Sequence, residues 1–218
     1  MISLNPTTLG NITLNIAFVL YLIVYVPQIR HNKNKHHLAE LSISLHMIIM
    51  TSFVLDLLYG LLKPLPWQYR AVSIVALGTL CIQQLQLMRL AQQRGQILLF
   101  STLGMFYLSL ILILILTSVF YFDALSSSSN TILLIGWVSR IGFLSYIVPQ
   151  IIKNYRMNSA KALNTTFLAL SLFLSLLDLT SAWCLDWGWP NKLGTPLTIT
   201  LTLMLLWQKK RYTPQFRT

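Results

Sequence analysis

Acidic side chains are scarce in this sequence. Its 218 residues include only five Asp and Glu against 16 Lys and Arg, and charged residues of both signs make up 10% of the chain. Hydrophobic residues make up 55%, which is more than the core of a soluble domain can use. The composition therefore predicts an all-α protein of the membrane.

Cysteine and catalytic motifs are also rare or missing. Cys81 and Cys184 both fall in or at the end of long apolar runs, and neither has CxxC or His-rich spacing, so we expect buried thiols rather than a disulfide or a metal site. The loop with His31, His36 and His37 is expected to face lipid headgroups rather than bind metal. No glycine-rich phosphate loop or nucleophile elbow is present, which argues against an enzyme. We expect no cofactor.

Seven apolar runs are long enough to cross a membrane. An α-helix rises about 1.5 Å per residue, so about 20 residues match a hydrocarbon layer of about 30 Å. The expected spans are residues 9–28, 41–62, 70–90, 97–120, 131–150, 163–185 and 194–208. The segment before the first span has no Lys or Arg, and that span is too long for a signal core. We therefore expect the first helix to stay in the mature protein.

Positive charges are concentrated in alternate loops. One side of the membrane would carry twelve Lys and Arg and the other three, with Arg140 left inside a span. The larger group is Arg30, Lys33, Lys35, Arg89, Arg94, Lys153, Arg156, Lys161, Lys209, Lys210, Arg211 and Arg217, and the smaller group is Lys63, Arg70 and Lys192. The positive-inside rule then predicts an outside or lumenal N-terminus and a cytoplasmic C-terminus. The same pattern accounts for the net charge of +11 without nucleic acid as a partner.

The second half of the sequence repeats the first. The motif Tyr-Val-Pro-Gln at 25–28 returns as Ile-Val-Pro-Gln at 147–150, at an offset of 122 positions with no gap. The pairs matched by this offset include Pro27 and Pro149, Gln28 and Gln150, Asn32 and Asn154, Leu41 and Leu163, and Asp56 and Asp178. We predict two homologous units, residues 9–90 and 131–208, joined by a linker helix at 97–120, with the functional site between them.

Two aspartates, Asp56 and Asp178, are the strongest candidates for function. A charged side chain near the middle of a membrane costs roughly 2.5 to 3.5 kcal/mol on insertion scales, and these two occupy equivalent positions of the repeat. We expect both to point into one central cavity and to bind a solute or a proton there. The alternative is that each is neutralised by a hydrogen bond or a cation and only holds helices together.

Arg140 suggests an unequal arrangement of the two acids. It lies about nine residues from the outer end of its span and Asp178 about seven from the outer end of the next, so their depths differ by roughly 3 Å. We predict a salt bridge between Arg140 and Asp178. The repeat equivalent of Arg140 is Phe18. Asp56 is therefore predicted to be free for a proton or a cationic group.

The two Pro-Gln pairs suggest a mechanical role. A proline near a helix end permits bending, and a glutamine can cap exposed carbonyls or close one mouth of a pathway. We expect Pro27, Gln28, Pro149 and Gln150 to act as hinge and gate.

At these residues the chain resembles the PQ-loop family of membrane transporters, over roughly residues 14–60 and 136–183. That family includes lysosomal cystine and cationic amino-acid exporters, and related folds include the SWEET sugar facilitators and their half-size bacterial relatives. The resemblance implies seven transmembrane helices in two parallel three-helix bundles joined by an inversion helix (3+1+3). It also implies one central substrate site and alternating access.

Details of the resemblance point to two solute classes. Residues 154–164 are similar to a loop of the amino-acid exporters, except that Lys161-Ala162 replaces their acidic-Gly pair. Tyr59-Gly60 is similar to the half-size sugar transporters and makes Tyr59 a site candidate. In those proteins an aromatic residue three positions earlier lines the sugar site, but this chain has Asp56 there. The difference favours a cationic or proton-coupled solute.

We therefore expect a secondary transporter of a small polar solute, with a cationic amino acid favoured and proton coupling as an option. One alternative is a SWEET-like sugar uniporter. Another is a receptor or assembly factor that transports nothing, since relatives of this fold include receptors and assembly factors. The lipid bilayer is the expected partner, in a bacterial inner membrane or a lysosome-like membrane. The oligomeric state stays open.

Overall fold

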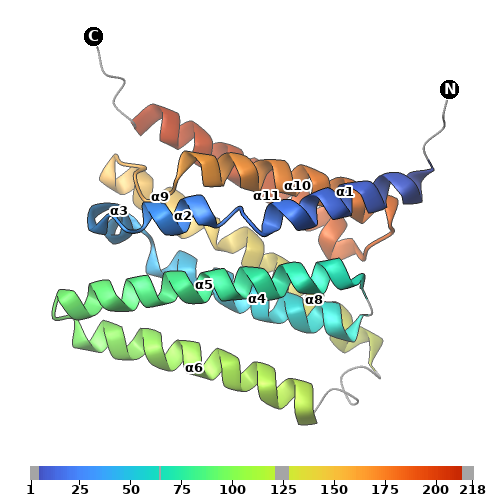
Figure 1. Ribbon diagram of the computed structural model, residues 1–218, viewed down its shortest axis with the longest axis horizontal. Helices are drawn as coiled ribbons and strands as arrows, with labels where there is room; N and C mark the ends of the chain where they lie inside the picture. The colour runs from blue at the N-terminus through green and yellow to red at the C-terminus, as the bar shows by residue number, and fades with distance from the viewer. Residues whose placement is uncertain (1–4, 64, 121–127, 213–218) are drawn as a thin grey trace.

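The computed structural model describes residues 5–63, 65–120 and 128–212, and the regular elements in these ranges are α-helices. In chain order they are α1 (Pro6–Tyr21), α2 (Val26–His31), α3 (Lys35–Glu40), α4 (Ile43–Leu62), α5 (Trp67–Gln93), α6 (Ile97–Phe120), α8 (Ser129–Ser145), α9 (Ile147–Met157), α10 (Thr165–Cys184) and α11 (Trp189–Tyr212). The long helices lie roughly along one another, with α6 at one edge of the assembly (Figure 1). The all-α prediction is confirmed for these residues.

Five helical segments are long and apolar enough to cross a membrane: Pro6–His31, Ile43–Leu62, Trp67–Gln93, Ser129–Met157 and Thr165–Cys184. They correspond to five of the seven expected spans. Within α6, Ile97–Ile113 forms a shorter apolar helix. The protein is therefore an integral membrane protein.

Two element boundaries differ from the sequence prediction. The last helix begins at Trp189 rather than Gly194, and Pro196 lies inside it. The sequence predicts a loop after the first span, but residues 35–40 form α3. The Asn34 side chain caps this helix by accepting a hydrogen bond from the His36 backbone N–H at 3.0 Å. Such a cap satisfies a backbone donor that a helix N-terminus otherwise leaves unpaired.

The Pro-Gln motifs break the helix in each half rather than end it. Pro27 lies at the start of α2, where a missing backbone N–H does no harm. The Ile23 carbonyl, which Pro27 cannot bind, accepts a hydrogen bond from the Val26 N–H at 3.0 Å. In the second half the break falls at Tyr146, between α8 and α9, three residues before Pro149. Both halves therefore bend at equivalent places.

The two halves meet through crossed helix pairs. α1 packs along α10, and α4 packs along α8, so the first helix of each half lies against the second helix of the other. The third helices stay within their own halves, because α5 packs on α1 and α4, and α11 packs on α8 and α10. α6 packs on α5 and α4. This arrangement encloses a space lined by both halves.

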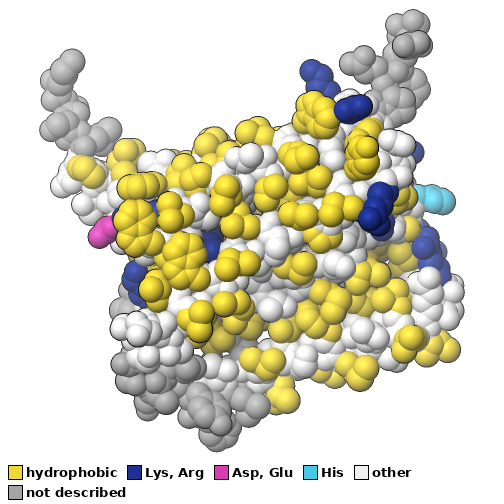
Figure 2. Space-filling model, turned by 180° about the vertical axis from the view of Figure 1, so that it is seen from behind, with side chains coloured by type: hydrophobic (Ala, Val, Ile, Leu, Met, Phe, Trp, Pro, Cys, Tyr) yellow, Lys and Arg dark blue, Asp and Glu magenta, His cyan; other side chains and the backbone are white. Residues whose placement is uncertain are grey.

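Basic side chains gather at one end of the molecule, which we call the basic end. It is formed by α2, α3, α9, the loops that follow them, the C-terminal end of α5 and the last turn of α11. Figure 2 shows one face of the molecule, with hydrophobic side chains over its middle and Lys and Arg side chains mostly towards one edge. Arg217 was counted with this group from the sequence but lies outside the described residues. The opposite end carries the N-terminus of α1 and the loop between α10 and α11.

Replacing Gly136 with Ala is expected to lower the free energy of unfolding by about 1 to 3 kcal/mol. A Cβ at Gly136 in α8 would lie 2.7 Å from Cε2 of Tyr59, whose side chain is 2% exposed and cannot move aside. Gly78 in α5 is the matched control, since a Cβ there meets nothing within 4 Å. Gly78→Ala should be neutral or stabilising through helix propensity. Thermal unfolding in detergent measures both, and an unchanged midpoint for Gly136→Ala would contradict this packing.

Candidate functional site

A central cavity of about 120 Å³ lies between the two halves. Its walls come from α1, α4 and α5 of the first half and from α8, α10 and α11 of the second. The charged side chains that line it, among the described residues, are Asp56, Arg140 and Asp178. The sequence-predicted acids and the arginine therefore share one cavity.

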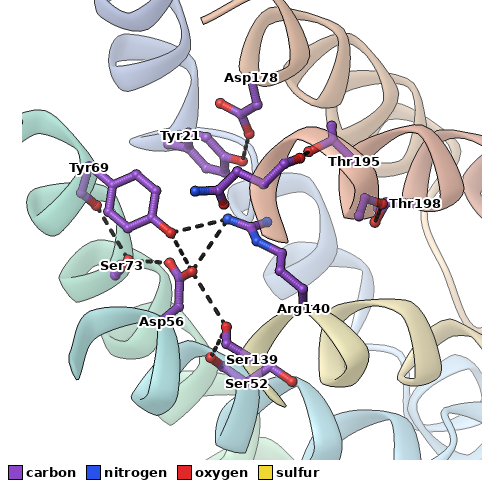
Figure 3. A network of polar contacts seen from close by, with 12 residues as sticks. Tyr21, Ser52, Asp56, Tyr69, Ser73, Ser139, Arg140, Asp178, Thr195 and Thr198 are labelled. Carbon is purple, nitrogen blue, oxygen red and sulfur yellow. Dashed lines mark hydrogen bonds and ion pairs between the residues drawn. The ribbon is translucent and has the colours of Figure 1, made fainter. Parts of the chain in front are cut away.

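Asp56 accepts hydrogen bonds from side chains of two helices, α5 and α8. Its Oδ1 accepts from the Tyr69 hydroxyl at 2.5 Å and from the Ser139 hydroxyl at 3.5 Å, and its Oδ2 accepts from the Ser73 hydroxyl at 2.9 Å. Tyr69 and Ser73 stand one turn apart on α5, so they reach the carboxylate from the same side. Figure 3 shows these side chains converging on Asp56. Asp56 is 5% exposed.

Arg140 forms a salt bridge with Asp56, so the predicted pairing with Asp178 is wrong. The Nη2 atom of Arg140 lies 3.4 Å from Asp56 Oδ1 and also donates to the Tyr69 hydroxyl at 3.1 Å. Depth along the membrane is similar for both aspartates, but α8 lies along α4, whereas α10 lies along α1. Which helices lie side by side, rather than the depth of each residue, therefore decides which aspartate pairs with Arg140. Gly194 of α11 leaves room for the Arg140 stem, since a Cβ there would lie 3.2 Å from its Cδ.

Asp178 has the most available carboxylate in the cavity. The Tyr21 hydroxyl of α1 donates to its Oδ2 at 2.6 Å. No other described side chain donates a hydrogen bond to it, and Asp178 is only partly buried. In Figure 3 its carboxylate lies across the network from Asp56, with Tyr21 beneath it. The pairing predicted for the two aspartates is therefore reversed: Asp56 is paired with Arg140, and Asp178 is bonded to Tyr21.

Asn191 is a site residue that the sequence reading missed. It lies in the first turn of α11, lines the cavity and is 1% exposed. Neither its Oδ1 nor its Nδ2 has a hydrogen-bond partner among the residues described. A buried polar atom without a partner costs about 1 to 3 kcal/mol, so this amide is suited to a polar group of a bound molecule. It was missed because the last span was predicted to begin at Gly194, which left Asn191 in a loop.

Tyr59 lies outside the residues that line the cavity. Its side chain is 2% exposed and packs in an apolar cluster with Leu14, Tyr69 and Trp187 towards the opposite end. Gly136 and Gly188 leave the space that its ring and hydroxyl fill. A direct contact of Tyr59 with a solute stays a prediction, and the packing gives the residue a supporting position behind Tyr69.

Gln28 ties the first half to the second at the basic end. Its Oε1 accepts from the Asn164 backbone N–H at 2.8 Å, and its Nε2 donates to the Ala162 carbonyl at 3.0 Å. Both partners lie in the loop before α10. The Asn32 side chain, one turn further along, accepts a second hydrogen bond from Nε2 at 2.7 Å. This glutamine is 1% exposed.

Gln150 makes the equivalent contacts in the other direction. Its Oε1 accepts from the Ser42 N–H at 2.8 Å, and its Nε2 donates to the Glu40 carbonyl at 3.3 Å and to Asn154 Oδ1 at 2.8 Å. Each of these partners corresponds to a partner of Gln28 at the repeat offset. We call the contacts made by Gln28 and Gln150 across the halves the two cross-half locks.

The third helices extend the symmetry. Gln86 of α5 donates to the Ile29 carbonyl at 3.0 Å, and Gln208 of α11 donates to the Ile151 carbonyl at 3.1 Å. One bond breaks the equivalence. Asn154 donates to Gln208 Oε1 at 3.0 Å, whereas Nδ2 of Asn32 and Oε1 of Gln86 have no partner within the described part of the chain. At the basic end, α11 is therefore joined to α9 by one more side-chain hydrogen bond than α5 is joined to α2.

Comparison with known proteins agrees with this geometry. The family model for the PQ loop repeat matches residues 9–69 and 131–191, together more than half of the chain. Among solved structures, that of a eukaryotic SWEET transporter is similar with a TM-score of 0.62 and 16% sequence identity, covering 94% of this chain and 98% of that chain. At that identity the likeness shows the fold. Comparison with curated protein sequences gives no match.

Proposed function

The chain belongs to the PQ-loop repeat family, and on this basis we propose that it is a secondary membrane transporter of a small polar solute. The observation that carries the proposal is a cavity between two repeated halves that holds three charged side chains. Ionisable residues inside a membrane are costly and generally mark a pathway for a substrate or an ion. The cavity is small beside the roughly 300 to 1,000 Å³ of drug-sized sites, which favours a small solute.

The charge of the cavity favours a cationic amino acid. Asp56 and Asp178 carry two negative charges when ionised, and Arg140 offsets one of them. A solute with one net positive charge, or a neutral amino acid together with a proton, would balance the other. We propose that Asp178 binds the solute ammonium group, because it has the most available carboxylate. The Asn191 amide would bind the solute carboxylate or another polar group.

Transport would proceed by alternating access in a 3+1+3 arrangement of seven helices. In this proposal α6 and α11 also cross the bilayer, and residues 9–90 and 131–208 form the two bundles. The cross-half locks of Gln28 and Gln150, beside the helix breaks near Pro27 and Pro149, would open the basic end. By the positive-inside rule that end faces the cytoplasm, in a bacterial inner membrane or a lysosome-like membrane.

A sugar uniporter is the second candidate, because the fold is similar to that of a SWEET transporter. Uptake of labelled arginine, lysine, neutral amino acids and monosaccharides into proteoliposomes at two pH values separates the candidates. Uptake of a cationic amino acid, in competition with other cations, supports the transporter of cationic amino acids. A sugar that equilibrates across the membrane equally at both pH values supports the sugar uniporter. Absence of flux for every solute would contradict both.

Replacing Asp178 with Asn is expected to reduce uptake of the cationic solute at least about tenfold, since a lost charge-assisted contact of about 1.4 kcal/mol has that effect. The change keeps the size of the side chain and its hydrogen bond with Tyr21. Asp186→Asn is the matched control, because the Asp186 side chain is 90% exposed and pairs with Lys192 outside the cavity. It should leave uptake unchanged. Equal uptake by the Asp178→Asn variant would exclude Asp178 as the ammonium site.

A further inference from the structure

A second, smaller cavity lies between the central cavity and the cross-half locks. It measures about 30 Å³, which is enough for one water molecule. It shares Tyr25, Ile49, Tyr146, Phe167 and Ser171 with the wall of the central cavity, so the two spaces are neighbours. Gln28, the residue of the first lock, also lines it. We call this space the His46 chamber, after its one ionisable imidazole.

His46 has no hydrogen-bond partner of normal geometry in this chamber. Its side chain is 0% exposed, and neither Nδ1 nor Nε2 is paired with any described residue. The Gln84 side chain of α5 faces the ring, and Gln84 Oε1 also lacks a partner within normal range. A buried nitrogen without a hydrogen-bond partner lowers the stability of the folded protein. Packing alone therefore does not explain a histidine at this position.

The fold itself does not require histidine at this position. The repeat equivalent of His46 is Leu168, which is 3% exposed and belongs to the apolar core at the basic end. An apolar side chain therefore fills the matching place in the second half. His46 is a polar departure from the repeat, as Arg140 is in the central cavity.

Among the described residues that line the chamber, no acidic side chain is present to balance a charge on His46. The ionisable groups that line the chamber besides His46, within the described residues, are the hydroxyls of Tyr25 and Tyr146. The groups facing it from the packed helices are neutral, with Gln83 and Gln84 from α5 and Thr202 from α11. A proton on His46 would therefore be poorly stabilised until water enters from the basic end.

We propose that His46 binds a proton during the transport cycle and that this proton favours opening of the basic end. The inference rests on the proposed function in one respect, that the protein alternates between two access states. The proton would arrive with the water that enters the His46 chamber from the basic end. Because the hydrated open state holds the proton more tightly than the closed state, lowering the pH shifts the population towards the open state. One linked proton changes the ratio of open to closed by at most about tenfold per pH unit.

The test follows the distance across the basic end and needs no solute. Spin labels are placed on cysteines at Lys33 and Tyr155, which are exposed and equivalent in the repeat. Cys81 and Cys184 are replaced with Ser. His31, His36 and His37 are replaced with Gln, so that His46 is the last of the four histidines. Full-length protein in lipid nanodiscs is then measured by double electron–electron resonance between pH 8 and pH 5.

The population with the longer distance should rise as the pH falls, at least about threefold over this range. His46→Leu, which copies the second half, should remove the response and keep the short distance at every pH. His46→Gln should do the same if the leucine variant does not fold. A pH response that persists in these variants, or no response with His46 present, would overturn the proposal. Solute uptake by the same protein tests the transport function separately, so uptake without the distance response leaves that function standing and removes only the role of His46.

Discussion

Replacing Arg140 with Met is expected to destabilise the protein by about 3 to 5 kcal/mol and to abolish transport, because it leaves Asp56 buried without its cation. The side chains of Arg140 and Asp56 are 19% and 8% exposed, so solvent replaces little of the lost contact. Arg140 also donates to Tyr69, which holds the other side of the same carboxylate. Loss of the arginine therefore affects contacts on α4 and α5 together. Methionine keeps most of the length of the side chain, so packing is largely preserved.

Denaturant titration in detergent measures the change in the free energy of unfolding of the Arg140→Met variant. Arg94→Met is the control, since Arg94 is exposed at the basic end and should change stability by less than about 0.5 kcal/mol. The double variant Asp56→Asn with Arg140→Met removes both charges and should recover most of the lost stability. If the single variant were as stable as the unaltered protein, the salt bridge would have no structural importance.

Replacing both Gln28 and Gln150 with Ala is expected to open the basic end and to reduce transport at least about tenfold. Each glutamine makes three hydrogen bonds, two of them to the backbone of the opposite half. A net hydrogen bond contributes about 0.5 to 1.5 kcal/mol, so the two locks together contribute several kcal/mol to the closed state. Without them the protein should remain open at the basic end and fail to complete a cycle.

The distance between labels at Lys33 and Tyr155 reports this opening directly. Gln93→Ala is the matched control, because Gln93 ends α5 and is exposed. It should change neither distance nor uptake. Either single lock variant should give an intermediate distance distribution. A short distance in the double variant would show that contacts other than the two glutamines hold the basic end closed.

The features that the sequence predicts well are those that depend on position along the chain. Apolar runs locate the helices, and the offset between the halves brings Asp56 and Asp178 to one cavity. The pairing of Arg140 could not be read in this way, because two side chains at equal depth meet only when their helices are neighbours. Asn191 was lost through an error of five residues in the start of a helix. His46 could have been found from its mismatch with Leu168 in the repeat.

The unequal pairing of Asn32 and Asn154 has a consequence for how the molecule moves. Since Gln208 bonds to Asn154 and Gln86 does not bond to Asn32, α5 is joined to α2 by one side-chain hydrogen bond fewer than α11 is joined to α9. Separation at the basic end should therefore start with α2 and α5, while α9 and α11 stay in place as a fixed support. α6 packs on α5, so it would travel with the moving part and displace lipid as it does so. The thickness and stiffness of the surrounding bilayer would then set part of the barrier to each turnover.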